Sequence, residues 1–362
     1  MSKIIGIGTA LPAHQHKQGD IMQFMQSVYA LNDTEKRKLR FLYHQSGIQY
    51  RHSVVADYNR PLHEWKFYPP SENLEPFPSL EMRMTWFNKY APPLSVDAIR
   101  DCIDGHIHAR DITHLITVSC TGMSAPGLDL QVMALMDLPK NIYRSSVNFM
   151  GCYAAIHALK MADAICKNEV SARVVIVCTE LCTLHFQKEP TADNIASSLL
   201  FADGSAAVLV AHDSFAGRGR RIHDFYAEVV PKGKKDMAWE LSGTGFLMTL
   251  SGYVPELIEE DFEDLVGRAL THAGKTKADI DNWCIHPGGK RILDVIGKTL
   301  QFPDHTLDNS YGVMNDFGNM SSPTILFVLK RILQQKEKGD EEIFGAAFGP
   351  GLTMETFVLA EA

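Results

Sequence analysis

The chain has 362 residues, of which 45% are hydrophobic and 22% charged, and its formal net charge is −8. This length allows two domains with a sizeable core, and the composition is average for a soluble globular enzyme. The acidic balance argues against nucleic acid or an anionic membrane as a partner, although a local basic cluster can still hold a phosphorylated ligand.

The start of the chain and its cysteines indicate a cytoplasmic protein. Residues 1–8 lack the apolar stretch and cleavage site of a signal peptide, and no apolar run approaches the roughly 18–20 residues of a membrane-spanning helix. The 7 cysteines are scattered, without CxxC pairs or metal-ligand spacing. Such thiols are typical of a reducing compartment, and we expect neither a metal site nor a bound cofactor.

Three pairs of segments echo each other, in the same order, in the two halves of the chain. In the first pair, an acidic turn and an apolar strand lead into a small-residue loop that opens a helix, over residues 111–122 and again over 278–289. In the second pair, residues 146–152 and 312–319 both pass through a glycine into a polar residue. Helical apolar periodicity after these two segments predicts one helix over residues 153–166 and another over residues 321–333.

The third pair consists of predicted strands, 173–178 with 206–210 and 342–347 with 353–359. Strands that alternate with helices of about ten or more residues are typical of βαβ units around a buried sheet. We therefore predict two similar α/β halves, residues 1–215 and 216–362, joined near residues 213–220, with chance similarity among α/β units as the alternative. If the chain is duplicated, equivalent strand-to-helix junctions converge on one pocket.

Cys152 follows a predicted strand and a glycine, at the start of a predicted helix. The positive end of a helix favours a thiolate, and with a cationic partner such positions lower a cysteine pKa from about 8.5 toward 3.5–7.5. We therefore expect a nucleophile, whereas a small buried hydrophobe is the plainer interpretation of one cysteine.

His286 and Asn319 lie at the two other junctions. His286 ends a predicted strand and precedes Pro287 and two glycines, which would let a thioester approach the backbone closely. Asn319 follows Gly318 and precedes a Met-Ser-Ser-Pro run. Taken alone, His286 could be a satisfied core residue and Asn319 a helix N-cap, since Asn favours that position.

Together the three residues fit one mechanism. Cys152 can attack an acyl thioester and form a covalent acyl-enzyme. His286 and the Asn319 amide can donate hydrogen bonds to an oxygen that gains negative charge. The enolate formed when a malonyl thioester loses carbon dioxide has such an oxygen, and decarboxylation itself supplies the carbanion, so no carboxylate base is needed.

Five motifs in chain order resemble the type III polyketide synthases, the chalcone-synthase-like branch of the thiolase superfamily. The motifs are FMGC at 149–152, LFADG at 200–204, IHPGG at 285–289, GNMSS at 318–322 and FGPGLTMET at 348–356. The sequence at residues 118–122 and 237–246 is more similar to that of bacterial members than to that of plant members. The resemblance implies a homodimer with the thiolase fold, whose two similar α/β halves form a five-layered αβαβα arrangement.

The resemblance also implies roles for individual residues. The family's nucleophile, histidine and asparagine fall on Cys152, His286 and Asn319. Phe201 matches the aromatic gatekeeper between the entry tunnel and the cavity, and Met248 replaces a second aromatic gatekeeper of the plant enzymes, so we expect a softer gate. The other positions expected to line the cavity are Cys120, Cys182, His185, Trp239 and Ser321. Core packing is the alternative for each of these cavity positions.

Two positions bear on the starter. Ala125 matches a methionine that plant relatives place on the loop reaching across the dimer into the partner's cavity, and the smaller side chain leaves room there. Trp239 fills floor space where plant members have glycine. A narrow channel suits a medium or long fatty acyl chain better than a bulky aromatic group, so we expect a fatty acyl starter.

Coenzyme A is expected to pass the basic stretch at residues 36–40. Lys38 corresponds to a phosphate-contacting lysine, Arg40 can assist as a rigid anion donor, and Gly289 is expected to contact coenzyme A as well. A solvated helix face is the alternative interpretation of the basic stretch. Gln45 occupies a place where plant members carry lysine, which leaves open whether the starter arrives on coenzyme A or on an acyl carrier protein.

The sequence therefore predicts a cytoplasmic type III polyketide synthase. It would load an acyl starter onto Cys152, extend it with malonyl-CoA by decarboxylative Claisen condensation, and release a cyclised pyrone or phenolic (resorcinol-type) product. One alternative is an initiating ketoacyl-acyl-carrier-protein synthase that stops after one condensation, against which Phe201 and the motif at 348–353 argue. The other is a non-catalytic acyl-binding partner, against which the intact Cys, His and Asn set argues.

Overall fold

The computed structural model describes residues 1–71, 73–233, 237–252, 254–335 and 341–361. The strands are β1 (Ser2–Ala10), β2 (His14–Lys17), β3 (Tyr50–Ser53), β4 (His114–Ser119), β5 (Tyr143–Asn148), β6 (Arg173–Leu181), β7 (Asp203–His212), β8 (Arg220–Val229), β9 (Met237–Ser242), β10 (Gly245–Leu250), β11 (Asn282–Ile285), β12 (Ile343–Gly349) and β13 (Thr353–Glu361). The α-helices are α1 (Gln18–Val28), α2 (Asp33–Gln45), α3 (Leu80–Ile103), α4 (Leu128–Met136), α5 (Ala154–Asn168), α6 (Ala192–Leu200), α7 (Val254–His272), α8 (Lys290–Thr299), α9 (Asp308–Phe317) and α10 (Thr324–Gln334).

Nine strands of the described residues form one continuous sheet, in the order β11-β12-β13-β8-β1-β7-β6-β4-β5. One pattern occurs in it twice. Strand β4 is parallel to β6, and β6, β7 and β1 then follow one another antiparallel. Likewise β11 is parallel to β12, and β12, β13 and β8 follow antiparallel. The two parts meet where β1 pairs with β8. There Lys3 is opposite Arg221, and Ile4 is opposite Arg220.

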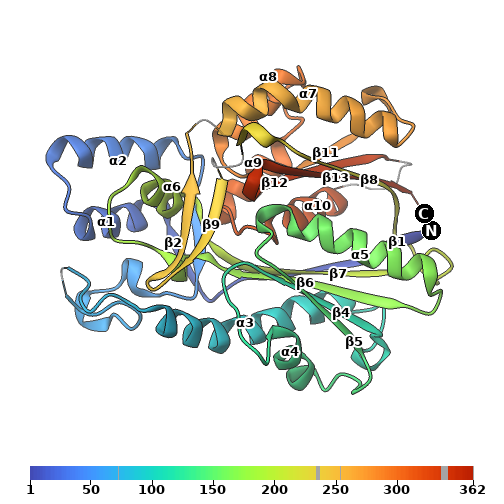
Figure 1. Cartoon of the computed structure of the whole chain (residues 1–362), viewed down its shortest axis with the longest axis horizontal. Helices are drawn as coiled ribbons and strands as arrows, with labels where there is room; N and C mark the ends of the chain where they lie inside the picture. Colours follow the sequence, from blue (N-terminus) through green and yellow to red (C-terminus); the bar gives the residue numbers. More distant parts are fainter. Residues whose placement is uncertain (72, 234–236, 253, 336–340, 362) are drawn as a thin grey trace.

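The helices are arranged in layers on these two parts of the sheet. Figure 1 shows α5 and α10 between the two parts, α7 and α8 on one outer face, and α3 and α4 on the other. The predicted arrangement of two similar α/β halves in five layers is therefore confirmed. The predicted boundary between residues 1–215 and 216–362 falls in the link from β7 to β8.

The two helices of the central layer are most deeply buried at their N-terminal ends. In α5 the small side chains of Ala154, Ala155, Ala158 and Ala162 are fully buried and let the helix approach both parts of the sheet. In α10 all the side chains from 324 to 329 are buried, which is the pattern of a helix enclosed on all sides.

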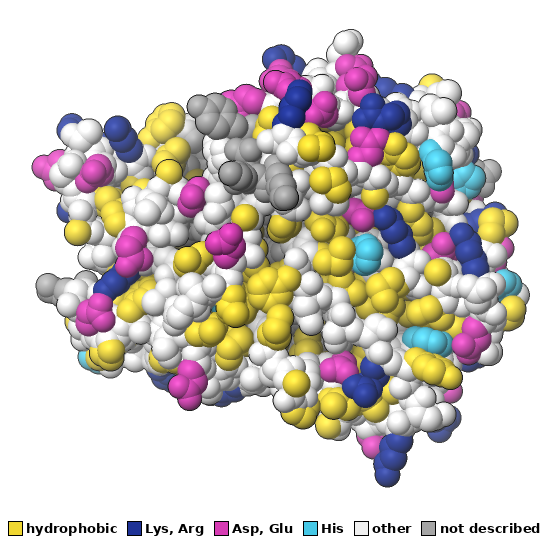
Figure 2. Space-filling view, viewed as in Figure 1, with side chains coloured by type: hydrophobic (Ala, Val, Ile, Leu, Met, Phe, Trp, Pro, Cys, Tyr) yellow, Lys and Arg dark blue, Asp and Glu magenta, His cyan; other side chains and the backbone are white. Residues whose placement is uncertain are grey.

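The outer surface is mixed in character. Figure 2 shows acidic and basic side chains interspersed on one face, with apolar side chains gathered across its lower centre. Among the described residues, no helix is long and apolar enough to cross a membrane.

The second pair of echoing segments differs in structure, so the expectation of three equivalent strand-to-helix junctions is wrong. Strand β5 precedes Cys152, whereas helix α9 precedes Asn319. Ser310, Val313 and Met314 of α9 are buried at helical spacing, which favours the helix in that segment. Helix α10 begins at Thr324 rather than 321.

Candidate active site

Cys152 lies in a tight turn whose shape requires a glycine. The 3-10 turn Gly151–Tyr153 connects the segment after β5 to α5. Gly151 has φ +75°, and a Cβ atom added there would lie 2.2 Å from Cδ of Pro350. A larger residue would therefore displace the turn, so Gly151 fixes the position of the neighbouring thiol.

Cys152 is half-buried, and its thiol faces polar neighbours. Its Sγ lies 3.6 Å from Oγ of Ser321. Burial raises the pKa of Cys152 to about 11, and Glu180 adds to the increase, whereas hydrogen bonding with Ser321 and Asn319 opposes it. The expected lowering of this pKa is wrong for the protein without substrate, because the loss of water outweighs the polarity of the helix that follows.

His286 is a buried imidazole with unused hydrogen-bonding capacity. It follows β11, and its backbone N–H donates to the carbonyl of Ala346 over 2.9 Å. Neither ring nitrogen has a hydrogen-bond partner among the described residues. Burial lowers the pKa of His286 to about 3, so the imidazole is neutral near pH 7. A buried polar group without a partner carries a desolvation cost, which a substrate atom could relieve.

His185 offers an instructive contrast. Its Nε2 donates to the carbonyl of Thr121 over 2.7 Å, and its Nδ1 accepts from the N–H of Phe246 over 3.1 Å. Its ring stacks on Phe246 with centroids 4.3 Å apart. Both nitrogens are therefore used within the protein, and His185 holds the cavity wall together.

The side chain of Asn319 connects its own loop to the loop of His286. Its Nδ2 donates to the carbonyl of Gly288 in the His286 loop over 3.2 Å. Its Oδ1 accepts from the N–H of Ser321 over 2.8 Å. The N-cap of α10 is Pro323, so the interpretation of Asn319 as the helix cap is wrong. The side chain is instead placed between the loop of His286 and the thiol of Cys152.

Phe201 is held at the same junction. The N–H of Asn319 donates to the carbonyl of Leu200, and the N–H of Ala202 donates to the carbonyl of Asn319, both over 2.9 Å. Nη1 of the buried Arg51 donates to the carbonyl of Phe201 over 2.7 Å. Sequence analysis did not single out Arg51.

Cys152 opens into an inner chamber of about 30 Å³, enough for no more than a few water molecules. The chamber is lined by Cys120, Thr121, Gly151, Cys152, Cys182, Phe201, Met237, Trp239, Met248, Ser321 and Pro350. His286 and Asn319 do not line it in the substrate-free protein.

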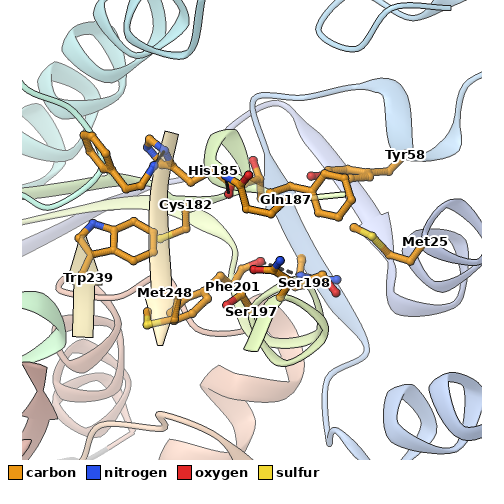
Figure 3. Close-up of a pocket in the computed structure, with 15 residues that line it drawn as sticks. Met25, Tyr58, Cys182, His185, Gln187, Ser197, Ser198, Phe201, Trp239 and Met248 are labelled. Carbon is orange, nitrogen blue, oxygen red and sulfur yellow. Dashed lines mark hydrogen bonds between the residues drawn. The ribbon is translucent and has the colours of Figure 1, made fainter. Parts of the chain in front are cut away.

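An outer chamber continues from the inner one. The two share Cys182, Phe201, Trp239 and Met248. In Figure 3, Trp239 and Met248 lie toward one end of this chamber and Met25 and Tyr58 toward the other, with Gln187, Ser197 and Ser198 between them. His185 belongs to this outer wall.

Trp239 limits the size of both chambers. It comes from β9, and its Nε1 donates to the carbonyl of Cys120 over 2.7 Å. Its ring packs edge-on against His185 and Phe246, with centroids 5.7 and 6.0 Å away. These contacts fix the indole, so it is a rigid wall rather than a side chain that can swing aside.

Glu180 was missed by the sequence analysis. It lies in β6 and is fully buried, and burial raises its pKa to about 7. Its carboxylate accepts hydrogen bonds from Ser322 Oγ, Thr121 Oγ1 and the N–H of Cys120 at 2.7–2.9 Å. It thereby ties the loop after β4 to the loop of Asn319. A glutamate inside the apolar run of residues 173–181 was the signal for it.

The other predicted residues lie apart from both chambers. Ala125 is exposed on the loop after β4 and lines neither chamber of its own chain. Lys38 and Arg40 are exposed on α2. Gly289 directly precedes α8, and a Cβ added to it would lie 3.6 Å from Leu200.

The chain is similar to known proteins over nearly its whole length. The family models of chalcone and stilbene synthases match residues 1–214 with their N-terminal domain and residues 221–362 with their C-terminal domain. Probable polyketide synthase 1 of Dictyostelium discoideum is 30% identical over 98% of the chain, which spans 11% of that protein. Type III polyketide synthase C of Arabidopsis thaliana is 27% identical over 98% of the chain and 94% of its own length.

Two solved structures have the same fold. The crystal structure of PKS-I from the brown alga Ectocarpus siliculosus superposes with a TM-score of 0.93 at 26% identity, covering 100% of this chain and 98% of the other. The C-terminal type III domain of Steely1, a type I/III hybrid from Dictyostelium, superposes with a TM-score of 0.91 at 28% identity, covering 99% of each chain.

The raised pKa of Cys152 predicts slow alkylation of the substrate-free enzyme near pH 7. Only the thiolate reacts with iodoacetamide, so the rate should keep rising with pH beyond the range of an ordinary cysteine. Intact-mass spectrometry across a pH series measures this rate, and Cys152→Ala gives the background from the 6 buried cysteines. Full reactivity already at pH 7 would mean that a cation stabilises the thiolate.

Proposed function

Since the chain belongs to the chalcone and stilbene synthase family and is a type III polyketide synthase, we propose that Cys152, His286 and Asn319 carry out its chemistry. Enzymes of this family use acyl-CoA and malonyl-CoA. The observation that supports the proposal best is the buried imidazole of His286, whose two ring nitrogens lack partners among the described residues. The Asn319 amide donates to the carbonyl of Gly288 in the His286 loop, and Ser321, in the same loop as Asn319, contacts the thiol of Cys152.

Loading begins with a thiol rather than a thiolate. As Sγ of Cys152 attacks the carbonyl carbon of the starter thioester, the neutral imidazole of His286 accepts its proton. The carbon–sulfur bond to the carrier thiol breaks, and that thiol leaves with the proton that His286 accepted. The starter is then held as a thioester of Cys152.

In extension, His286 and Asn319 act as hydrogen-bond donors. The thioester oxygen of a malonyl unit accepts hydrogen bonds from His286 and from the second N–H of the Asn319 amide. The bond to the carboxylate breaks, carbon dioxide leaves, and its electron pair forms the enolate. The enolate carbon attacks the acyl carbon on Cys152, the new carbon–carbon bond forms, and the Cys152 sulfur is released.

The two alternatives are less well supported. Family models for chalcone and stilbene synthases match both halves of the chain, which favours this family over an initiating ketoacyl-acyl-carrier-protein synthase. The relatives are named polyketide synthases, which argues against a non-catalytic partner. The proposed product is a cyclised pyrone or resorcinol-type phenol.

We further propose a cytoplasmic homodimer whose interface includes β5. This strand is at the edge of the sheet, and most of its side chains are exposed. Tyr143 at its start is 68% exposed, and Leu135 of the neighbouring α4 is 53% exposed. An open edge beside exposed apolar side chains is suited to pairing with a second copy. The loop that contains Ala125 lies on the same side of the fold.

The proposed starter is a medium or long fatty acyl chain. The outer chamber, which has a volume of about 30 Å³ in the substrate-free protein, is lined from Cys182 and Phe201 to Met25 and Tyr58. Lys38, Arg40 and Gly289 are proposed to contact the coenzyme A part of the thioester.

Asn319→Asp tests the catalytic role of the amide. The change removes a donor and adds a repelling charge, so release of carbon dioxide from malonyl-CoA should fall by about 10²–10³. Thermal stability should change little. Acyl loading, read by intact mass, should persist in Asn319→Asp and be absent from Cys152→Ala. Decarboxylation at the wild-type rate would contradict the proposed role.

Trp239→Ala should lengthen the products. Removing the indole joins free volume to the inner chamber, so at least some chains should gain an additional malonyl unit. Liquid chromatography with mass spectrometry, using isotope-labelled malonyl-CoA, counts the units. An unchanged product spectrum in a folded variant would show that Trp239 does not limit chain growth.

Starter preference should rise with acyl length until the outer chamber ends. Each buried methylene contributes about 0.8 kcal/mol, or roughly a fourfold gain in kcat/KM. The measurement compares saturated acyl-CoAs of increasing length with an aromatic starter, in wild type and in Ala125→Met. A preference for the aromatic starter would contradict the proposal, and an unchanged response in Ala125→Met would exclude this loop from the acyl channel.

A further inference from the structure

Arg51 is a deeply buried cation in β3. Along this strand the buried side chains of Arg51 and Ser53 alternate with half-buried ones. Arg51 is 3% exposed, and it forms no ion pair with any residue that the structure describes. A charge that is buried without an opposite charge is costly, so its presence indicates a role beyond packing.

The helix that ends before Phe201 has its last carbonyls bound by other elements. Helix α6 ends at Leu200. Each carbonyl from residue 198 to residue 201 accepts a hydrogen bond from outside the helix. The donors, in that order, are Tyr43, Gln18, Asn319 and Arg51, over 2.7–3.1 Å. Carbonyls at the end of a helix have no partner within it and attract cations, so Arg51 completes the C-terminal cap of α6.

The orientation of the Arg51 guanidinium is fixed by two contacts. Its Nε donates to Oε1 of Gln18 over 2.9 Å, and its Nη1 donates to the carbonyl of Phe201 over 2.7 Å. The amide of Gln18 in turn donates to the carbonyl of Leu199 over 2.9 Å. Arginine presents its donors in a rigid planar fork, so these two contacts set the plane of the group.

The aliphatic part of Arg51 contacts the loop of Asn319. Gly318 directly precedes Asn319 and has φ +71°. A Cβ atom added to Gly318 would lie 2.9 Å from both Cγ and Cδ of Arg51. The arginine stem therefore occupies the space that a larger residue would need. Phe201 and Asn319 pair in an isolated β-bridge, and Arg51 thus touches both sides of that bridge.

We propose that Arg51 is a positioning residue for the Asn319 amide and for the side chain of Phe201. The inference rests on the function proposed above. Because Phe201 and Asn319 are joined by main-chain hydrogen bonds, a shift of one moves the other. Arg51 holds this bridge in place, and the Asn319 amide then keeps the orientation in which its N–H reaches the thioester oxygen of a malonyl unit. In this role Arg51 itself touches neither the thioester nor the thiol.

Two other roles for Arg51 are less well supported. A purely structural cation would stabilise the fold without favouring one step, but the contacts of Arg51 converge on Phe201 and Gly318. A contact of the acyl chain is the second alternative, because Arg51 also lines the outer chamber. However, its Nε and Nη1 are both used within the protein.

Arg51→Met removes the guanidinium and keeps an unbranched stem. Release of carbon dioxide from malonyl-CoA should fall by roughly 10–10²-fold, because the Asn319 donor is displaced from the thioester oxygen. Acyl loading of Cys152, read by intact mass, does not use this donor and should stay within about threefold of wild type. Arg51→Lys keeps the charge without the planar fork, so its loss of decarboxylation should be smaller.

A double variant tests whether Arg51 acts through Asn319. Asn319→Asp already lacks the donor. Adding Arg51→Met to it should therefore lower decarboxylation by no more than about twofold further, since residues that act as a unit are not additive. A full additional loss would mean that Arg51 acts by another route.

Arg83→Met is the matched control. Arg83 is also fully buried, and it donates to main-chain carbonyls. The acceptors are those of Pro78, Leu184 and Phe186. Thermal unfolding should show a loss of stability in both Met variants, because each leaves buried carbonyls without a donor. In Arg83→Met the ratio of decarboxylation to loading should remain that of wild type.

If Arg51→Met does not fold, Arg51→Lys and Gln18→Met carry the test. Gln18→Met removes the acceptor of the Arg51 Nε, so it should cause the same selective loss of decarboxylation at a smaller size. Wild-type decarboxylation in both folded variants would overturn the inference.

Two further results would also overturn it and leave the proposed function standing. An equal loss of loading and decarboxylation in Arg51→Met would make Arg51 a purely structural cation. Unchanged decarboxylation with an altered preference for acyl length would make it a contact of the acyl chain. A wild type that releases no carbon dioxide from malonyl-CoA would instead overturn the proposed function.

Discussion

The burial of α5 and α10 between two parts of a sheet is the constraint on which the site depends. The first turns of both helices are deeply buried, so they cannot shift without opening cavities. The turn of Cys152 leads directly into α5, and the loop of Asn319 and Ser321 leads into α10. The buried starts of these two helices therefore position the thiol and the amide. The loop of His286 is added from β11, which lies at the edge of the sheet.

Around this fixed centre, polar groups join loops that are far apart in the chain. Glu180 connects the loop after β4 to Ser322, and Asn319 connects the His286 loop to the strand-like pairing at Phe201. Buried hydrogen bonds of this kind are costly to break singly, because each leaves a partner without solvent. His286 differs from these groups, because neither of its ring nitrogens has a partner among the residues that the structure describes. A neutral imidazole of this kind is suited to exchange protons and hydrogen bonds with a substrate.

The two chambers bear on different parts of substrate selection. The indole of Trp239 restricts the volume near Cys152, and the outer chamber extends past Phe201 toward Met25 and Tyr58. The inner wall thus bears on how far a chain grows, and the outer chamber bears on which starter is held.

The sequence by itself indicated alternating strands and helices, two similar α/β halves and the identity of the candidate cysteine, histidine and asparagine, because periodicity and short motifs are local. Tertiary structure decided the rest. The pKa of Cys152 depends on desolvation by elements far along the chain, so a local view of its helix predicted the wrong direction. The role of Asn319 as a bridge, the contacts of Glu180 and the exposure of Ala125 follow from how distant loops meet. The pattern of residues along one segment does not show which of its side chains another segment will bury. Burial in turn affects the protonation state and the hydrogen-bond partners of the groups in this site.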